Sequence, residues 1–408
     1  MKIFTAPQIR ACDAYTIKAS NLRPAELMER AAMKCAGWIR DQYPKDSLFV
    51  VLCGTGNNGG DGLAITRLLH QRGYGVKAFL LNFSKELFPD CLTNFQQLQA
   101  LDKELVSVVQ PDTFITDIPP HIIIIDAILG TGLNRPTQGW VAAFIKQINH
   151  LPNEKISIDM PSGLPADTTP DEDAIILRAT HTLSFQFYKR TFLHPESGVY
   201  AGQVHLLDIG LDKTFINATH TQYKTIDPED AAAIYRSRSP FAHKGTFGSV
   251  LLAGGSHGKI GAMILSSRAA LRAGAGLVTA LIPACGYTAL QAAVPEAMCR
   301  TSGEGALEKI DGWEKSTTGI GPGMGTDPLS ATALSEFIDA CKTPVVVDAD
   351  ALNLMARQPE LLAKLPKGSI LTPHHKEFAR LFGENTNTMI QVDHARIQAM
   401  RYNINIVL

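Results

Sequence analysis

The stretch LFVVLC-GTGNNGGDG-LAITRLL (residues 48–69) joins an apolar run of strand length to a helical pattern through a glycine-rich loop. Glycines at positions 54, 56 and 59 have the G-x-G-x-x-G spacing of a dinucleotide-binding loop. Such folds also place an acidic residue at the end of the next strand to hold the ribose. Here that strand ends in Leu81-Asn82-Phe83, without a carboxylate. The stretch therefore predicts a strand–loop–helix unit of an α/β fold, and its ligand has to be inferred from other residues.

Further apolar runs of strand length follow, and helical patterns separate the first of them. The predicted strands cover residues 76–81, 122–125, 156–158, 182–187 and 204–207. A helix is also expected near the N-terminus, because Thr5 and Gln8 can form a capping box with Pro7 in the first turn. Strands that alternate with helices predict a mostly parallel, doubly wound sheet.

Polar residues follow three of these strands at the point where each strand ends. Asn58 lies in the first glycine loop, Asp126 closes a run of four isoleucines, and Asp159 and Ser162 follow the next strand. For a single aspartate a helix N-cap would be the better explanation, but three such endings, each followed by glycine, favour a binding site. Oxygen groups such as those of Asn58, Asp126 and Ser162 suit a hard cation. The remaining carboxylate, Asp159, could then transfer a proton.

Length and composition limit the function further. A chain of 408 residues exceeds the size that one hydrophobic core usually supports, so two domains are expected. Hydrophobic residues make up 45% and charged residues 19%, which is typical of a globular protein. The 38 basic and 39 acidic residues leave a formal charge of −1, so binding to nucleic acid or to an anionic membrane is not predicted.

Cysteine usage and the N-terminus indicate the compartment. The seven cysteines are scattered without a C-x-x-C pair, which favours reduced thiols over disulfides or a zinc site. The N-terminus lacks an apolar segment of signal-peptide length, and the longest aliphatic run, residues 122–125, is too short to span a bilayer. We therefore expect a soluble, cytoplasmic protein.

The second half of the chain repeats the α/β pattern. Residues 211–239 contain no comparable apolar strand, and a new helix cap is expected at Asp227, so we place the domain boundary here, with domains at 1–212 and 213–408. Beyond it, a strand, a glycine loop and a helix cover residues 249–273. Further strands are expected at residues 277–282, 318–320, 345–347 and 370–371.

The polar residues of this half are less informative taken singly. The glycines after its first strand can bind phosphate, or they can simply let a helix pack closely on the sheet. Asp348 and Asp350 again follow a buried strand. His374 stands in a loop before an amphipathic helix, where a histidine is more often a structural hydrogen-bonder than a catalyst.

The motifs NNGGDG, D-A-x-x-G-T-G and D-x-P-S-G, in this order, resemble the NAD(P)H-hydrate epimerase family, the YjeF N-terminal domain, over about residues 1–212. The resemblance implies a Rossmann-like αβα sandwich. It implies a potassium ion (K+) on Asn58, Asp126 and Ser162, and Asp159 as the residue that contacts the substrate and is the expected acid/base. The residues implied to bind the hydrated cofactor are Asn57, Asn58, Gly59, Gly60 and Asp61 in one loop and Gly130, Thr131, Gly132, Leu133, Asn134, Arg135 and Pro136 in another.

From about residue 225 onward, the segments GIGPGMG (319–325), VVVDADALNL (345–354) and ILTPHHKEFARLFG (370–383) resemble the ADP/ATP-dependent NAD(P)H-hydrate dehydratase family. That family has a ribokinase-like fold and uses ADP or ATP with Mg²⁺. The resemblance implies that Ala262, Gly323 and His374 line the pocket for the S form of the hydrated cofactor.

This second half also departs from the family pattern. The family has a proline after the Gly-Ala pair, where this chain has Met263, and its T-P-H-P-G-E motif is here Thr372-Pro-His-His-Lys-Glu377. The K-G-x-x-T and G-[ST]-G-D motifs, which carry the nucleotide and the catalytic aspartate, do not occur in the sequence. We therefore expect an incomplete second domain that lacks dehydratase activity and leaves apolar surface uncovered.

These observations predict a bifunctional repair enzyme that epimerises the R and S hydrates of NADH or NADPH and, in its full-length form, dehydrates the S form at the expense of ADP or ATP. A ribokinase-type small-molecule kinase is the first alternative, because fold does not determine function. A non-catalytic dimerising scaffold is the second, although such a protein is expected to lose Asp159 or the potassium ligands. We also expect the chain to form a homo-oligomer through its first domain.

Overall fold

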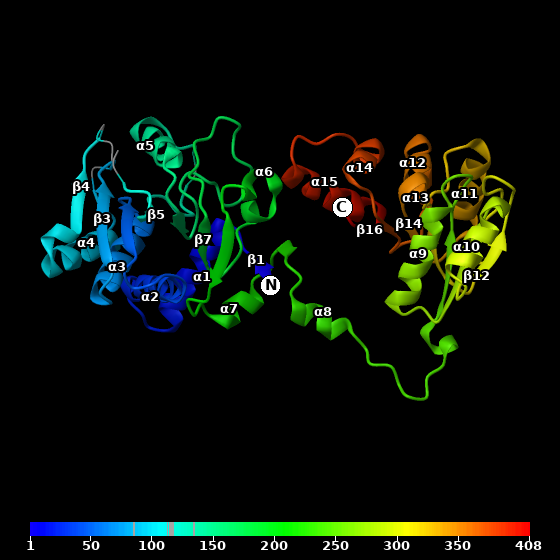
Figure 1. Cartoon of the computed structure of the whole chain (residues 1–408), viewed down its shortest axis with the longest axis horizontal. Helices are drawn as coiled ribbons and strands as arrows, with labels where there is room; N and C mark the ends of the chain where they lie inside the picture. Colours follow the sequence, from blue (N-terminus) through cyan, green and yellow to red (C-terminus); the bar gives the residue numbers. More distant parts are fainter. Residues whose placement is uncertain (85, 112, 114–117, 134) are drawn as a thin grey trace. The chain divides into compact units, whose positions relative to one another are not determined.

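A computed structural model describes the chain at residues 1–84, 86–111, 113, 118–133 and 135–408 (Figure 1). The chain divides into two compact units, Met1–Tyr235 and Arg236–Leu408. Each unit has a seven-stranded parallel sheet between helices, so the predicted α/β fold class is confirmed.

The first sheet has the strand order β4-β3-β2-β5-β6-β7-β8, with every neighbouring pair parallel. Its strands are β2 (Leu48–Cys53), β3 (Gly75–Leu81), β4 (Val106–Val109), β5 (Ile123–Ala127), β6 (Lys155–Ile158), β7 (His181–Phe185) and β8 (Gln203–Leu207). All but β4 were predicted from the sequence. The order changes direction at β2 and β5, and in such sheets ligands bind beyond the carboxyl ends of the strands at this point.

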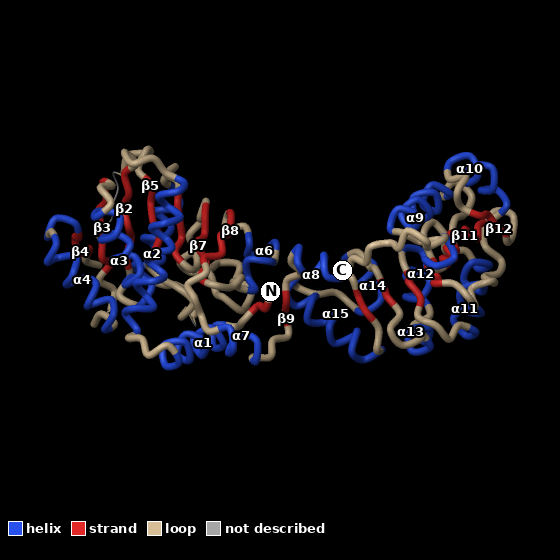
Figure 2. Tube along the Cα trace, turned by 90° about the horizontal axis from the view of Figure 1, so that it is seen from below, coloured by secondary structure: helices blue, strands red, loops and turns tan. Residues whose placement is uncertain are grey.

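Helices cover both faces of this sheet (Figure 2). They are α1 (Ala6–Ala19), α2 (Pro24–Gln42), α3 (Asn57–Gln71), α4 (Pro89–Leu101), α5 (Gly139–His150) and the short α6 (Pro195–Gly198). Alternate strand residues face opposite helices. Val51 and Ile125 pack in one cluster with Leu63 of α3, whereas Leu52 packs in another with Phe144 of α5.

The N-terminal helix begins as predicted. Thr5 accepts a hydrogen bond from the Gln8 backbone N–H, and the Gln8 side chain accepts one from the Thr5 backbone N–H at 3.0 Å. This capping box satisfies two backbone donors that the first turn of α1 would otherwise leave without partners.

Residues beyond the predicted boundary at 212/213 belong to the first unit by their contacts. The segment contains α7 (Lys213–Ala218), β9 (Tyr223–Lys224) and α8 (Pro228–Ile234). Strand β9 pairs with β1 (Lys2–Ile3), and the amino group of Met1 lies 3.3 Å from the Asp227 carboxylate. The chain therefore passes from the first compact unit to the second between Tyr235 and Arg236.

The second sheet has the order β12-β11-β10-β13-β14-β15-β16 and is also parallel throughout. Its strands are β10 (Ser249–Ala253), β11 (Leu277–Ile282), β12 (Met298–Thr301), β13 (Thr317–Ile320), β14 (Val345–Val347), β15 (Ile370–Leu371) and β16 (Asn405–Ile406). Its helices are α9 (Ile260–Ala273), α10 (Tyr287–Ala293), α11 (Pro328–Ala340), α12 (Ala349–Arg357), α13 (Glu360–Lys364), α14 (His375–Phe382) and α15 (Thr388–Tyr402).

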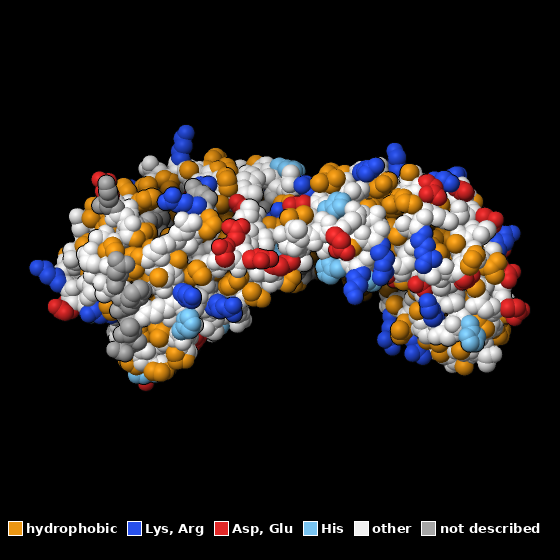
Figure 3. Space-filling model, turned by 90° about the horizontal axis from the view of Figure 1, so that it is seen from above, with side chains coloured by type: hydrophobic (Ala, Val, Ile, Leu, Met, Phe, Trp, Pro, Cys, Tyr) orange, Lys and Arg blue, Asp and Glu red, His pale blue; other side chains and the backbone are white. Residues whose placement is uncertain are grey.

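The surface agrees with the balanced composition. Acidic and basic side chains are interspersed on the face drawn in Figure 3. In the described part of the chain, no helix is long and apolar enough to cross a membrane. Apolar side chains near the end of the second unit are more than half exposed, among them Ile397, Met400 and Val407.

Candidate active site

Asp126 lies at the carboxyl end of β5 and is fully buried. Its Oδ1 accepts from the Ser162 hydroxyl at 2.5 Å and from the Ile128 backbone N–H at 3.3 Å. Its Oδ2 accepts from the Ser157 hydroxyl and the Ser162 backbone N–H, both at 2.8 Å. Burial raises the pKa of Asp126, and these four hydrogen bonds oppose the rise by stabilising the carboxylate.

Asn58 is brought to the same place by the first turn of α3. Its amide Nδ2 donates to the Leu129 carbonyl at 3.0 Å, and the Leu129 N–H donates to the Ser162 hydroxyl at 2.8 Å. The other amide atom, Asn58 Oδ1, is buried and has no hydrogen-bond partner among the described residues. Asn58, Asp126 and Ser162 thus meet around one backbone segment, and one of their oxygens is left unsatisfied.

Glycines let the first loop pack tightly. A Cβ on Gly59 would lie 1.8 Å from the Gly54 carbonyl oxygen, and one on Gly60 would lie 2.8 Å from the sulfur of Met28. Both glycines are buried, whereas Asn57 beside them is exposed. Close packing therefore accounts for Gly59 and Gly60 whether or not they contact a ligand.

Asp159 follows directly after β6 and has a left-handed backbone, with φ of +63°. Its N–H donates to the Leu183 carbonyl at 2.8 Å, which ties it to β7. Its Oδ1 accepts from the Phe185 N–H at 3.3 Å and forms an ion pair with the Lys189 ammonium. A non-glycine residue with this φ costs about 1–3 kcal/mol, and such positions are concentrated at functional sites.

Lys189 was not predicted from the sequence. Its side chain is 1% exposed, and its ammonium group also donates to the Ser184 hydroxyl at 2.8 Å. The available signal was a lysine shortly after a predicted strand, in the segment FYKR, on the edge where Asp126 and Asp159 were expected.

Two further carboxyl groups share this region. Burial, reinforced by the charges of Asp159 and Asp13, raises the pKa of Asp61 well above its usual value. Burial and the charge of Asp159 raise the pKa of Asp13 to about 6, although Lys189 opposes the rise. Asp13 lies on α1, and only its helix was predicted. A cluster of carboxyl groups with shifted pKa values is typical of a site for acid–base chemistry.

The second predicted loop lines a neighbouring cavity of about 320 Å³. Four of its residues lie on the wall: Thr131, Leu133, Arg135 and Pro136. The segment from Pro165 to Asp171 also lines this cavity. Gly130 lies close to the Asn58 side chain, Gly132 has open space around it, and Asn134 is outside the described residues.

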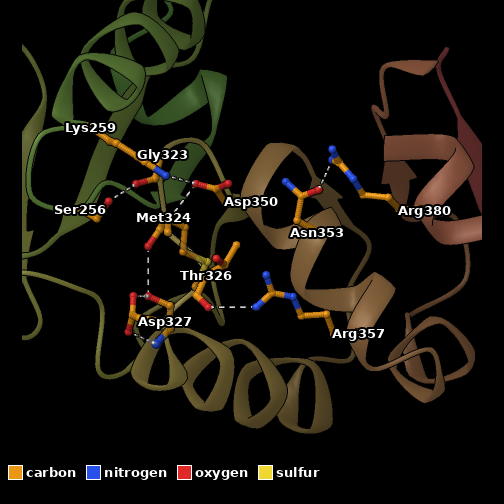
Figure 4. A network of polar contacts seen from close by, with 12 residues as sticks. Ser256, Lys259, Gly323, Met324, Thr326, Asp327, Asp350, Asn353, Arg357 and Arg380 are labelled. Atoms are coloured by element: carbon orange, nitrogen blue, oxygen red, sulfur yellow. Dashed lines mark hydrogen bonds and ion pairs between the residues drawn. The ribbon is translucent and has the colours of Figure 1, made fainter. Parts of the chain in front are cut away.

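In the second unit, Ala262 and Gly323 lie against each other. A Cβ on Gly323 would be 3.2 Å from the Ala262 Cβ and 2.5 Å from the Lys259 carbonyl oxygen. The glycine loop is fixed by Ser256, whose hydroxyl donates to the Gly323 carbonyl at 2.8 Å (Figure 4). Asp350 holds its other end through the Gly325 N–H at 2.9 Å.

His374 is the N-cap of α14. The ring Nδ1 of His374 accepts a hydrogen bond from the Lys376 backbone N–H at 3.2 Å. The backbone N–H of His374 donates to the Glu377 carboxylate at 3.0 Å. The side chain is 61% exposed. These contacts fulfil the structural role that the sequence already suggested, and they leave the implied substrate contact as a prediction.

A second cavity, of about 530 Å³, lies beside the glycine loop of Gly323. It is lined by Thr326, Asn353, Ala356, Arg357 and Arg380. Arg357 donates to the Thr326 carbonyl at 3.3 Å, and Arg380 donates to the Asn353 side chain at 2.7 Å (Figure 4). Neither guanidinium forms an ion pair within the described part of the chain. Two such groups on one cavity suit a phosphate.

Comparison with known proteins agrees with this geometry. Residues 24–191 match the family profile of the YjeF-related protein N-terminus, and residues 250–408 match that of NAD(P)H-hydrate dehydratase. The bifunctional NAD(P)H-hydrate repair enzyme Nnr of Moorella thermoacetica is 32% identical over 98% of this chain and 78% of its own length. The chain belongs to the family of bifunctional NAD(P)H-hydrate repair enzymes.

Other members of the NAD(P)H-hydrate repair family match similarly. The Nnr enzyme of Escherichia coli K12 is 32% identical over 93% of this chain and 72% of its own length. Among solved structures, the ADP/ATP-dependent NAD(P)H-hydrate dehydratase of Bacillus subtilis, co-crystallised with ATP/Mg²⁺, is 27% identical. The match covers 44% of this chain and 64% of that chain, with a TM-score of 0.36.

The motif-based prediction of this family is confirmed, as is the prediction of two α/β domains, each with a parallel sheet. Membership of the repair family favours repair over a ribokinase-type kinase and over a scaffold.

Proposed function

We propose that this chain repairs hydrated nicotinamide cofactors. Its first domain would interconvert the R and S hydrates of NADH or NADPH. Its second domain would bind the S hydrate, and dehydration with ADP or ATP and Mg²⁺ would also need the K-G-x-x-T and G-[ST]-G-D motifs, which do not occur in this sequence. The observation that carries the first assignment is the set of carboxyl groups at the sheet edge, where Asp159 is ion-paired and Asp61 and Asp13 have raised pKa values.

Epimerisation of a hydrated ring carbon has simple requirements. The hydroxyl leaves from one face as water, and water adds to the other face, so one group donates a proton and another accepts one. Asp159, paired with a cation, suits the acceptor, and Asp61, whose pKa is raised by burial, suits the donor. Asp61 lies in α3, which follows β2, and Asp159 lies directly after β6.

Asn58, Asp126 and Ser162 fit a potassium ion. The buried Asn58 Oδ1 has no protein partner among the described residues, and the three side chains offer oxygen donors only, which suits a hard cation. When bound, the ion would supply a fixed positive charge for the phosphates of the substrate. The two loops, at residues 57–61 and 130–136, are the proposed binding elements for that substrate.

The second domain is proposed to bind the S hydrate near Ala262, Gly323 and His374. Arg357 and Arg380 support this proposal, because they offer guanidinium groups to an anionic ligand beside the loop of Gly323. A cytoplasmic location and self-association remain predictions.

The direct test of the first activity follows pure S-hydrate of NADH by chromatography, with potassium and without it. We expect equilibration with the R form, and we expect Asp159→Asn to abolish it. Asparagine is the suitable replacement because it tolerates a left-handed backbone better than alanine. Folded wild-type protein that leaves the S-hydrate unchanged beyond its spontaneous rate would refute the proposal. Addition of ADP and Mg²⁺ to the S-hydrate tests the second domain, and formation of NADH would contradict the expected lack of dehydratase activity.

A further inference from the structure

A lysine is buried in the candidate site of the first domain, and its partners are specific. Lys189 is the N-cap of the short 3-10 helix at Arg190–Leu193 and follows β7. Its ammonium contacts Asp159 Oδ1 and the Ser184 hydroxyl, and Ser184 in turn donates to the Phe187 carbonyl at 2.8 Å. Removing a cation from water costs several kcal/mol, so a lysine that is 1% exposed is retained only with close partners.

The surroundings of Asp159 are otherwise acidic or neutral. Asp13 approaches from α1 and Asp61 from α3, and the Cys35 thiol on α2 also senses the charge of Asp159. Burial comes first among the causes that raise the pKa of each of these three groups. Among the described groups whose charges act on this cluster, Lys189 is the cation. The carboxyl groups of Asp13, Asp61 and Asp159 therefore share the site with the Lys189 ammonium. Among the described ion pairs, this ammonium pairs with Asp159.

The two oxygens of Asp159 have different environments. Oδ1 accepts from Lys189 and from the Phe185 N–H, whereas Oδ2 has no hydrogen-bond partner within the described chain. The Asp159 side chain is 13% exposed, so part of it remains accessible. Hydrogen bonds therefore hold Oδ1 in place, whereas Oδ2 is available to contact a substrate.

We propose that Lys189 is a positioning residue, whose ammonium group fixes Asp159 Oδ1 so that Oδ2 faces the substrate. The inference rests on the proposed epimerase activity. Lys189 does not exchange a proton with the substrate in this scheme. It places a positive charge beside Asp159, the carboxyl group that acts as the base.

The test replaces Lys189 with methionine, which keeps the length of the side chain and removes its charge. The measured quantity is kcat/KM for epimerisation of the S-hydrate of NADH between about pH 5.5 and pH 8.5. We expect the acidic limb of the profile to move upward by at least about one pH unit, so the variant loses about tenfold or more at pH 6 and recovers toward pH 8. Lys189→Arg, which keeps the charge, should retain the wild-type profile.

Lys155 offers a matched control. It is also buried, at 6% exposure, and it lies at the other end of β6, where its ammonium donates to the carbonyls of Leu151 and Asn153. Lys155→Met removes a buried lysine from the same domain without touching Asp159, so it should leave the pH profile in place. A pH-independent loss in Lys189→Met, or the same shift in both methionine variants, would overturn the inference.

Folding can be separated from the chemistry. Circular dichroism checks each variant first. If Lys189→Met does not fold, Lys189→Gln takes its place with the same expected shift, because glutamine is neutral and can still donate to Ser184. An inactive wild-type protein would refute the proposed function. If the wild type is active and a folded, uncharged Lys189 variant keeps the wild-type pH profile, only the role of Lys189 is refuted.

Discussion

Ser162 donates two hydrogen bonds to Asp126, one from its backbone N–H to Oδ2 at 2.8 Å and one from its hydroxyl to Oδ1 at 2.5 Å. The serine that follows β6 therefore fixes the carboxylate that ends β5. The same hydroxyl accepts from the Leu129 N–H, so it also anchors the loop that begins the second predicted binding element.

Ser162→Ala and Ser157→Ala form a matched pair, because each removes one hydroxyl donor to Asp126. Each should lower the free energy of unfolding by about 1–3 kcal/mol, since a buried carboxylate loses a partner. Urea unfolding measures this loss. In the epimerase assay, only Ser162→Ala should raise the potassium concentration needed for half-maximal activity. An equal change in both variants would argue against Ser162 as a potassium ligand.

Potassium should stabilise the protein through Asn58. A ligand that binds only the folded state raises the melting temperature, and the buried Asn58 Oδ1 has no protein partner in the described chain. We expect a higher Tm in potassium chloride than in choline chloride at equal ionic strength, and no difference for Asn58→Ala. Asn94→Ala is the control, because Asn94 is also buried but donates to the Asp90 carbonyl at 3.0 Å. Equal Tm values for the wild type in both salts would contradict the site.

Asp13 should make the first domain less stable as the pH rises. Its pKa is raised to about 6 from an unfolded value near 3.8, so the folded state binds the proton more tightly. The stability is therefore fully present below the unfolded value and is lost progressively as the pH rises through about 6. Asp13→Asn should remove this dependence and increase the unfolding free energy at pH 8 by roughly 1–3 kcal/mol.

Denaturant unfolding at pH 4, 6 and 8 checks the Asp13 prediction. Asp46→Asn is the control, because Asp46 is exposed on the same domain. A pH dependence that survives unchanged in Asp13→Asn would show that other groups cause it.

Asp61→Asn should separate activity from stability. Burial raises the pKa of Asp61, so folding at neutral pH has to take up a proton that the unfolded chain releases. A neutral amide of the same shape removes this cost and should stabilise the fold. The amide cannot donate a carboxyl proton, so epimerisation should fall by about 100-fold or more. Tm and R/S interconversion are measured on the same sample. A variant that is more stable and equally active would exclude Asp61 as the proton donor.

Arg380→Met should weaken the binding of a phosphate-bearing ligand by the second domain. NADP⁺, as a stable stand-in for the hydrated cofactor, is titrated by calorimetry, and we expect about a tenfold loss, since charged hydrogen bonds to phosphate contribute about 1.5–3 kcal/mol. Arg268→Met is the control, because Arg268 is also exposed and donates only to a backbone carbonyl, that of Ala293. Equal affinity of the two variants for NADP⁺ would show that the Arg380 guanidinium does not bind the phosphate.

The parts of the site that the sequence predicted are those fixed by local pattern. Asn58, Asp126 and Asp159 each follow a strongly apolar strand, and a parallel sheet necessarily brings such strand ends to one edge. The strand β4 was missed because Val106–Val109 is short and contains a polar residue. Six of the seven strands of the first sheet needed no tertiary information.

Lys189 and Asp13 could not be predicted in the same way. Asp13 reaches the site from a helix that precedes the sheet, and its position depends on how α1 packs. A lysine in sequence is expected to be solvated, so the burial of Lys189 becomes apparent only when Ser184 and Asp159 are found around it. His374 shows the opposite case, because its capping contacts are local and its predicted structural role is visible in the sequence.

The left-handed backbone of Asp159 has a practical consequence for capturing a complex. Glycine adopts a φ of +63° without steric strain, so Asp159→Gly relieves the backbone while it deletes the carboxylate. The product should be an inactive chain that keeps its cavity, with Thr131, Leu133, Arg135 and Pro136 on the wall. Such a chain, soaked with an unstable hydrated dinucleotide, would hold one epimer in place long enough for its stereochemistry to be seen directly in electron density.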